Sequence, residues 1–155
     1  MRIRNITDND IAEVATLMRG LSQEFITNEG SAAAADFFTR ENDGAGLRSF
    51  IGAGMVYHVA EQDGRIVGFV ALRESKHLFH MFVDKHHHRQ GIAKALWATA
   101  RQTALDAGNP GVFTVNSSNY AVAAYEALGF VRTAPTQCKN GIYYNPMILD
   151  GRHSD

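Results

Sequence analysis

One short stretch, KHHHRQGIAKALW at residues 85–97, holds many of the residue types that can do chemistry in this chain. Its left end has three adjacent histidines, and its right end has a glycine followed by an apolar run with helical spacing. The first turn of a helix has unpaired backbone N–H groups and the positive end of the helix dipole. Small residues at Gly91 and Ala93 would let phosphate oxygens approach those amides closely. The stretch therefore predicts an anion site, with the alternative that Gly91 only makes the turn.

The histidine run suggests a second chemistry, metal binding, which the spacing does not favour. His86, His87 and His88 are adjacent, so they point in different directions in an extended or a helical backbone. They would not converge on one metal ion without further ligands. We expect no metal here, and instead expect these histidines to add positive potential beside the turn, together with Lys85, Arg89 and Lys94.

The elements that must position this turn follow from hydrophobic periodicity and turn signals. Strands are predicted at Ile3–Ile6, Met55–Glu61, Arg65–Arg73, His77–Asp84, Gly111–Val115, Phe130–Thr133 and within Ile142–Leu149. Helices are predicted at Ile11–Leu21, Ser31–Arg40, Ile92–Ala107 and Asn119–Leu128, and the glycines of Gly44–Gly54 predict a long loop. The Asp-Gly pair at residues 63–64 predicts a hairpin, and the strand at His77–Asp84, apolar at nearly every position, is expected to be central. The order implies a mixed sheet covered by helices on both faces.

Composition sets the broad class. A chain of 155 residues, 45% hydrophobic and 20% charged, fits one globular α/β domain. A net charge of -1 gives no global attraction to nucleic acid or to an anionic membrane, so neither is expected as a partner. The single cysteine and the lack of a long apolar run predict a cytoplasmic protein.

Two segments carry a resemblance to a known family. HRQGIA at residues 88–93 resembles the acyl-CoA pyrophosphate loop of the GNAT superfamily of N-acyltransferases, Q/R-x-x-G-x-G/A, with His88 where glutamine or arginine is usual. SNYAVAAYEALGF at residues 118–130 resembles the second CoA motif of that family, with Ser118 where asparagine is common. The resemblance implies a GNAT N-acetyltransferase domain at residues 1–150, a short tail at 151–155, and a splayed sheet of six to seven strands. The splay is expected between Leu78–Val83 and Gly111–Val115.

The resemblance also implies which residues bind acetyl-CoA and which act on it. The implied cofactor-binding residues are Phe82, Val83, His88, Arg89, Gln90, Gly91, Ile92, Ala93, Lys94, Ser118 and Tyr125. Periodicity alone makes Tyr125 a core aromatic, whereas the family places this tyrosine beside the CoA sulfur, where it can stabilise or protonate the leaving thiolate. A strand N–H near Phe82 or Val83 is expected to stabilise the charge that develops on the carbonyl oxygen.

The general base is the open assignment. The family often uses a carboxylate on the strand before the phosphate loop, but this position is occupied by His77, and His80 is the alternative on the same strand. The period-2 rule puts the two histidines on opposite faces. Either can accept a proton near neutral pH. Glu24, Glu29 and Glu74 remain alternatives, as does water.

The resulting prediction is an N-acetyltransferase that transfers an acetyl group from acetyl-CoA to a small-molecule or peptide amine by direct attack in a ternary complex. One alternative is a catalytically inactive acyl-CoA-binding domain of the same fold, and another is a metal-dependent protein that uses the histidine run. The C-terminal strand, with Tyr143 and Tyr144, is predicted to be an edge that forms a homodimer.

Overall fold

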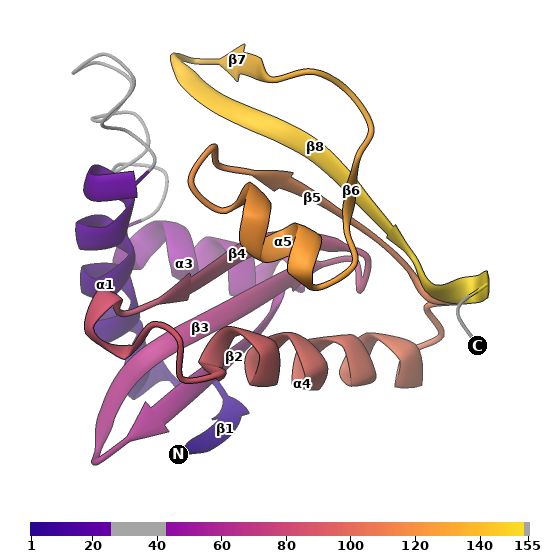
Figure 1. The fold of residues 1–155 in the computed structure, drawn as a ribbon. Coiled ribbons are helices and arrows are strands. Elements are labelled where there is room, and N and C mark those ends of the chain that lie inside the picture. The colour runs from indigo at the N-terminus through magenta and orange to yellow at the C-terminus, as the bar shows by residue number, and fades with distance from the viewer. Residues whose placement is uncertain (26–42, 154–155) are drawn as a thin grey trace.

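The computed structural model describes residues 1–25 and 43–153, and this part of the chain forms one mixed sheet with helices on both faces (Figure 1). The sheet has eight strands, with β1 to β6 and β8 in the order β1-β2-β3-β4-β5-β8-β6 and with β7 paired to β8. The strands are β1 Arg2–Asn5, β2 Val56–Gln62, β3 Arg65–Arg73, β4 His77–Val83, β5 Val112–Ser117, β6 Val131–Arg132, β7 Gln137–Lys139 and β8 Ile142–Asp150. The α-helices are α1 Ile11–Phe25, α3 Gly44–Gly52, α4 Ile92–Asp106 and α5 Val122–Ala127. Short 3-10 turns lie at Asp8–Asp10, Lys85–His87 and Gly151–His153.

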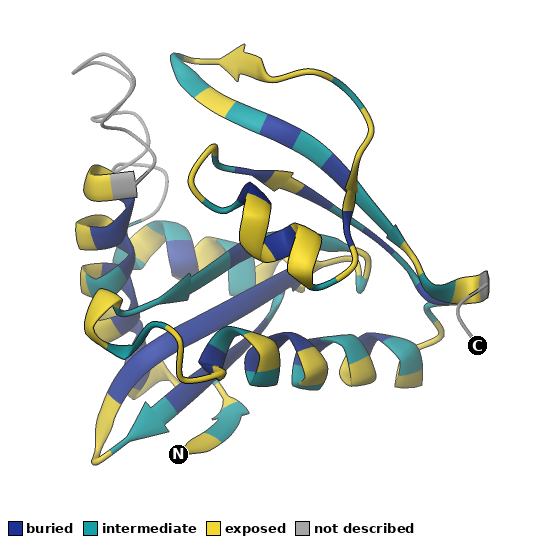
Figure 2. Cartoon of the chain, viewed as in Figure 1, coloured by how far each residue is buried: buried dark blue, intermediate teal, exposed yellow. Residues whose placement is uncertain are grey.

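Two hydrophobic clusters lie on the two faces of the sheet. One packs α4 and α5 against the sheet and contains Leu78, Leu96 and Tyr125, and the other packs α1 and α3 against the opposite face and contains Leu47 and Phe69. Strand β3 is buried at seven of its nine positions because both faces are covered, as Figure 2 shows. The predicted α/β class with helices on both faces is confirmed.

The β2–β3 hairpin is confirmed by its backbone. Asp63 and Gly64 have φ values of 53° and 76°, and Gln62 pairs with Arg65 across them. Positive φ at both central residues is the geometry of the tight hairpin turns that match strand twist.

The sheet opens between β4 and β5. These strands are parallel but pair at two positions, His77 with Thr114 and Leu78 with Val115. Beyond that point β5 stays paired to β8 while β4 stays paired to β3, so the two strands diverge (Figure 1). The predicted splay at this place is confirmed.

The predicted loop at Gly44–Gly54 is wrong, because most of it is helix α3. Asp43 caps this helix by accepting a hydrogen bond from the Gly46 N–H at 2.8 Å. Leu47 is fully buried against α1 and the sheet. Tertiary burial of this apolar face outweighs the poor helix propensity of glycine. The helix predicted at Ser31–Arg40 lies outside the described residues.

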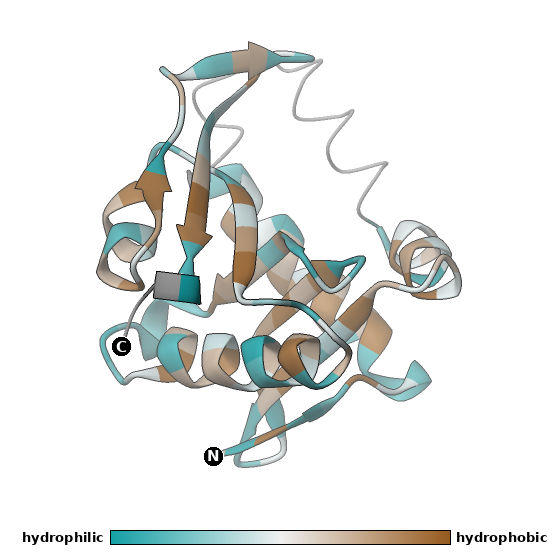
Figure 3. Ribbon diagram, turned by 90° about the vertical axis from the view of Figure 1, so that its right-hand side faces the viewer, coloured by the Kyte–Doolittle hydropathy of each residue, from teal (hydrophilic) through white to brown (hydrophobic). Residues whose placement is uncertain are grey.

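The C-terminal part of the chain differs from the prediction in one additional strand. Strand β7 was not predicted, and it forms a hairpin with β8 through Asn140 and Gly141, whose φ values are 53° and 77°. Strand β8 pairs on both sides at Met147 and Ile148, with β5 and β6, whereas Ile142–Tyr144 pairs with β7 alone, so the homodimer edge predicted at Tyr143 and Tyr144 stays a prediction. Figures 1 and 3 show that the β7–β8 hairpin projects beyond the rest of the sheet. β8 ends at Asp150, and the division into a domain at 1–150 and a tail at 151–155 stays a prediction.

Candidate active site

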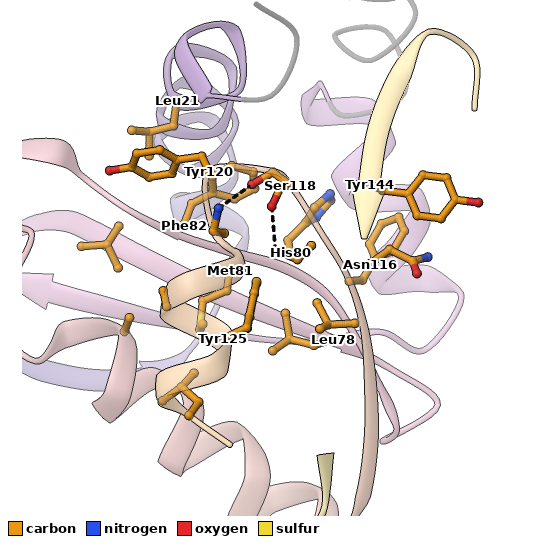
Figure 4. Close-up of a pocket in the computed structure, with 18 of the residues that line it drawn as sticks. Leu21, Leu78, His80, Met81, Phe82, Asn116, Ser118, Tyr120, Tyr125 and Tyr144 are labelled. Carbon is orange, nitrogen blue, oxygen red and sulfur yellow. Dashed lines mark hydrogen bonds between the residues drawn. The ribbon is translucent and has the colours of Figure 1, made fainter. Parts of the chain in front are cut away.

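A cleft of about 1280 Å³ lies where β4 and β5 diverge (Figure 4). Residues from β4, the turn before α4, β5, α5 and the β7–β8 hairpin line it. The predicted site residues that line it are His77, Phe82, Val83, His88, Arg89, Gly91, Ile92, Ala93, Lys94, Ser118 and Tyr125. Gln90 is the one predicted residue outside this lining. The structure thus brings residues from both motifs into one cleft.

One end of the cleft is a backbone cradle at the start of α4. Arg89 and Gly91 have φ values of 65° and 77°, so the turn alternates through the left-handed region. Turns of this kind direct successive N–H groups toward one concavity, a common anion site. The helix that follows has 15 residues, and its dipole adds positive potential at the same place.

Gly91 leaves room in this cradle. A Cβ built on Gly91 would meet nothing within 4 Å, so the position opens onto free space. The side chains of Arg89 and Lys94 border the same cleft. An open, amide-lined and cationic turn fits the pyrophosphate of a coenzyme A.

His88 has a structural role in this turn. Its Nε2 lies 2.7 Å from the carbonyl oxygen of Val83, and because a carbonyl only accepts, the ring nitrogen is the donor. The bond ties the turn to the end of β4. A long polar side chain at this position can make such a contact, which explains how histidine stands where the family motif has glutamine or arginine.

Strand β4 directs backbone N–H groups into the cleft. The Asp84 N–H donates to the Val67 carbonyl at 2.8 Å, and Phe82 stands opposite Phe69 two residues earlier. Residues of an antiparallel pair alternate between facing the partner strand and facing away. The N–H groups of Met81 and Val83 therefore face the gap toward β5. Of the two N–H groups expected to stabilise the carbonyl oxygen, that of Val83 points into the cleft and that of Phe82 points to β3.

A β-bulge at Phe79 changes which side chains of β4 lie on each face of the sheet. Ala71 pairs with His80 and Leu72 pairs with Leu78, so Phe79 is the extra residue. His77 and His80 consequently lie on the same face of β4, the face toward α1 and α3. The expectation that they lie on opposite faces is wrong, because the period-2 rule holds only where the ladder is regular.

The two histidines have different surroundings. His77 Nδ1 lies 2.8 Å from Thr114 Oγ1, and burial together with Arg73 and Lys76 lowers the pKa of His77. His80 is buried, its Nδ1 lies 3.5 Å from the Tyr57 hydroxyl, and burial lowers the pKa of His80 to about 3. Both imidazoles are neutral near physiological pH, and His80 is the weaker base.

Tyr125 is held by helix α5. The residue is 5% exposed and lines the cleft, and its ring packs edge-on against Phe130, with ring centroids 5.6 Å apart. Burial raises the pKa of Tyr125 above its ordinary value, so the phenol stays protonated. The helix starts after Ala121 rather than at Asn119, and the Ser118 hydroxyl accepts a hydrogen bond from the Ala121 N–H at 3.2 Å.

The other candidate bases lie elsewhere. Glu24 forms an exposed ion pair with Lys85 at 3.3 Å, and Glu74 lies in the exposed β3–β4 turn. Neither lines the cleft. Glu29 lies outside the described residues. Within residues 1–25 and 43–153, no group of three His, Cys, Asp or Glu side chains is placed to hold a metal ion.

Several residues of the cleft were not predicted from the sequence. They are Leu21 and Phe50 from the early helices, Phe79 from the bulge, and residues of the β7–β8 hairpin such as Lys139 and Tyr144. An Asn-Gly hairpin signal at residues 140–141 marks the hairpin, but the sequence carries no local signal that Leu21 and Phe50 meet β4.

Comparison with known proteins gives the class of this fold. A family model described as "Acetyltransferase (GNAT) domain" matches residues 22–150. The structure resembles PaiA N-acetyltransferase of Thermoplasma acidophilum, solved in complex with coenzyme A, with a TM-score of 0.80, 14% identity and coverage of 96% of this chain and 98% of that one. It also resembles YncA of Salmonella typhimurium, solved with acetyl-CoA, with a TM-score of 0.69, 20% identity and coverage of 97% and 93%. These likenesses define an acyltransferase fold.

The chain belongs to the GNAT acetyltransferase family, a family of acyltransferase enzymes. Among curated proteins, human N-acetyltransferase 8 is 42% identical over 93 residues, which cover 52% of this chain and 40% of that protein. The chain thus spans about two fifths of the length of the curated relatives that it matches first. No helix in the described part of the chain is long and apolar enough to cross a membrane.

Proposed function

We propose that this domain transfers an acetyl group from acetyl-CoA to a primary amine by direct attack in a ternary complex. The observation that carries the proposal is the cleft itself, because it joins an anion cradle at Gly91 to a buried phenol at Tyr125 through the gap between β4 and β5. Structural neighbours solved with coenzyme A or acetyl-CoA, and relatives named N-acetyltransferases, support it.

Acetyl-CoA supplies an acetyl group activated as a thioester. The backbone amides near Gly91, with Arg89 and Lys94, would bind its pyrophosphate. The pantetheine arm would then lie along the gap between β4 and β5, where β4 has no partner strand on the side toward β5. This orients the thioester toward Tyr125 and the N–H groups of Met81 and Val83.

The chemistry must remove protons from the amine nitrogen and supply one to the leaving sulfur. A lysine-like amine with a pKa of about 10.4 is neutral in only about one molecule in two thousand near neutral pH, so a proton must leave the nitrogen. We assign that proton to His77, directly or through water, since His77 is less buried than His80. The neutral amine nitrogen bonds to the acetyl carbon, the carbon–sulfur bond breaks, and the Tyr125 hydroxyl gives its proton to the departing sulfur. The second proton, which the nitrogen loses as the amide forms, returns through water to the Tyr125 phenolate. The Val83 N–H stabilises the carbonyl oxygen meanwhile.

A non-catalytic acyl-CoA-binding domain is the second candidate, because burial weakens both β4 histidines as bases. One assay separates the two functions. Purified protein is mixed with acetyl-CoA and a panel of primary amines, and free thiol is measured between about pH 7 and 9. Thiol release that depends on an amine supports transfer. Calorimetric binding of acetyl-CoA without thiol release at any pH would support the binding domain instead.

Two further predictions concern the whole protein. We retain a cytoplasmic location from the single cysteine, and a homodimer that uses the edge of β8 at Tyr143 and Tyr144, which pair with β7 alone. Sedimentation of the purified protein tests the second of these.

A further inference from the structure

The cleft has a second wall, opposite the cofactor turn. The phosphate cradle and Tyr125 belong to the side of the sheet covered by α4 and α5. An amine that attacks the thioester must come from the remaining side, which faces α1 and α3. Leu21, Phe50, Phe79, His80 and Phe82 line the cleft there, and we call them the acceptor wall.

The acceptor wall is a cluster of rings. Phe50 packs edge-on against Phe79 with centroids 5.1 Å apart, and His80 lies 4.3 Å from Phe79 and 5.9 Å from Phe82. The bulge at Phe79 is what puts it beside His80 on one face of β4. The three phenylalanines are half-buried, so part of each ring remains open to the cleft. Such a surface gains free energy by covering apolar area of a ligand.

The charged side chains among the described residues of the cleft are all cationic. Of the described residues that line it, none is Asp or Glu, whereas Arg89, Lys94 and Lys139 are cationic. His80, inside the acceptor wall, is neutral because of its burial. A second ammonium group on an acceptor would lose its water and find no carboxylate among the described residues of the cleft to pair with, which is costly.

Resting on the acetyl transfer proposed above, we propose that the acceptor is a primary amine on an apolar body without a second ammonium group. The apolar body packs against the acceptor wall, and the neutral amino group faces the thioester near His80. Polyamines and other polycationic amines are poor acceptors.

Two amines that share one six-carbon chain test this inference. Hexylamine and hexamethylenediamine differ only in the second amino group. At saturating acetyl-CoA, with rates corrected for the neutral fraction and for the two reacting ends of the diamine, we expect kcat/KM for hexylamine to be at least about tenfold higher. An equal or higher value for the diamine would overturn the inference while leaving acetyl transfer intact.

A binding measurement keeps the inference testable if no amine is acetylated. Both amines are titrated by calorimetry into the protein saturated with coenzyme A. Tighter binding of hexylamine supports the acceptor class even where the proposed transfer fails. Equal or tighter binding of the diamine contradicts it.

A charge change at Phe50 sharpens the test. Phe50→Glu places a carboxylate on the acceptor wall, and Phe50→Gln is the neutral control of the same size. We expect Phe50→Glu to shift the hexylamine-to-diamine ratio of kcat/KM at least about tenfold toward the diamine relative to Phe50→Gln. The same ratio in both variants would mean that the second amino group never comes near this wall.

Discussion

The two sides of the cleft are built in different ways. The cofactor side is a continuous piece of chain, from the end of β4 through the turn at Arg89 and Gly91 into α4, and its key groups are backbone amides. The acceptor wall takes side chains from α1, α3 and β4, which come together only in the folded sheet. The cofactor side therefore depends on local backbone geometry, and the acceptor wall depends on side-chain identity. The predictions below test the cofactor side alone or the groups that act on the thioester and the amine between the two sides.

The largest effect is expected at the cofactor turn. Gly91→Glu should weaken acetyl-CoA binding by about a thousandfold, because a carboxylate would fill the open space at Gly91 and repel the pyrophosphate. Gly91→Gln adds the same volume and the same left-handed strain, roughly 1–2 kcal/mol, without the charge. We expect Gly91→Gln to weaken acetyl-CoA binding only about tenfold, as measured by calorimetry. Equal losses in the two variants would argue against an anion at this turn.

Tyr125 lies where the two sides meet, and its hydroxyl should matter for turnover alone. Tyr125→Phe keeps the ring that packs against Phe130 and removes the proton donor. We expect kcat to fall by about a hundredfold with KM for acetyl-CoA unchanged. Because burial raises the Tyr125 pKa, the hydroxyl keeps its proton at least up to about pH 10, the ordinary tyrosine pKa. Wild-type activity should therefore show no decline from deprotonation of Tyr125 below that pH. A wild-type rate in the variant, with chemistry limiting, would return Tyr125 to the hydrophobic core.

His77 should show its role through pH. His77→Gln keeps a polar side chain near Thr114 but cannot accept a proton, and we expect kcat/KM for the amine to fall by about ten- to a hundredfold near neutral pH. The deficit should shrink as pH rises, because more of the amine is already neutral. Because the pKa of His77 is lowered from its ordinary value of 6.5, His77 is neutral at and above pH 6.5. The wild-type rate should therefore show no loss from protonation of His77 in that pH range. A deficit that is constant with pH would contradict the base assignment.

The smallest effect is expected at His88, which supports the cofactor side indirectly. His88→Leu removes the donor to the Val83 carbonyl, and acetyl-CoA affinity should fall by about fivefold, the worth of one ordinary hydrogen bond. His88→Gln can donate the same bond and should stay within about twofold of the wild type. Neither variant should change the ratio of kcat/KM between two amines, since the acceptor wall is untouched.

The contrast between the two sides also explains what could be predicted from the sequence. The turn at Gly91, the helix that follows and the helix of Tyr125 are local patterns, so their placement near one cleft could be anticipated. The hairpin at Asp63-Gly64 was predicted for the same reason, and the Asn140-Gly141 hairpin carried an equal signal that was missed.

The rest depends on contacts that are distant in sequence. Helix α3 contains three glycines and forms because Leu47 is buried against α1, which propensity cannot reveal. The bulge at Phe79 arises from the register with β3, and a single strand carries no sign of it. The period-2 pattern therefore predicts the wrong faces for His77 and His80, and it gives no sign of the acceptor wall.

Strands β4 and β5 pair at only two positions, and this short pairing affects amide hydrogen exchange along β4. Central strands of a sheet usually hold the most slowly exchanging amides of a domain. Past Leu78, however, β4 has a neighbour on one side only, so protection should alternate along it. The amide of Phe82 should exchange slowly, and those of Met81 and Val83 should exchange rapidly in the free protein and slow down when acetyl-CoA binds. A strand in the middle of the fold would thus give the exchange pattern of an edge strand.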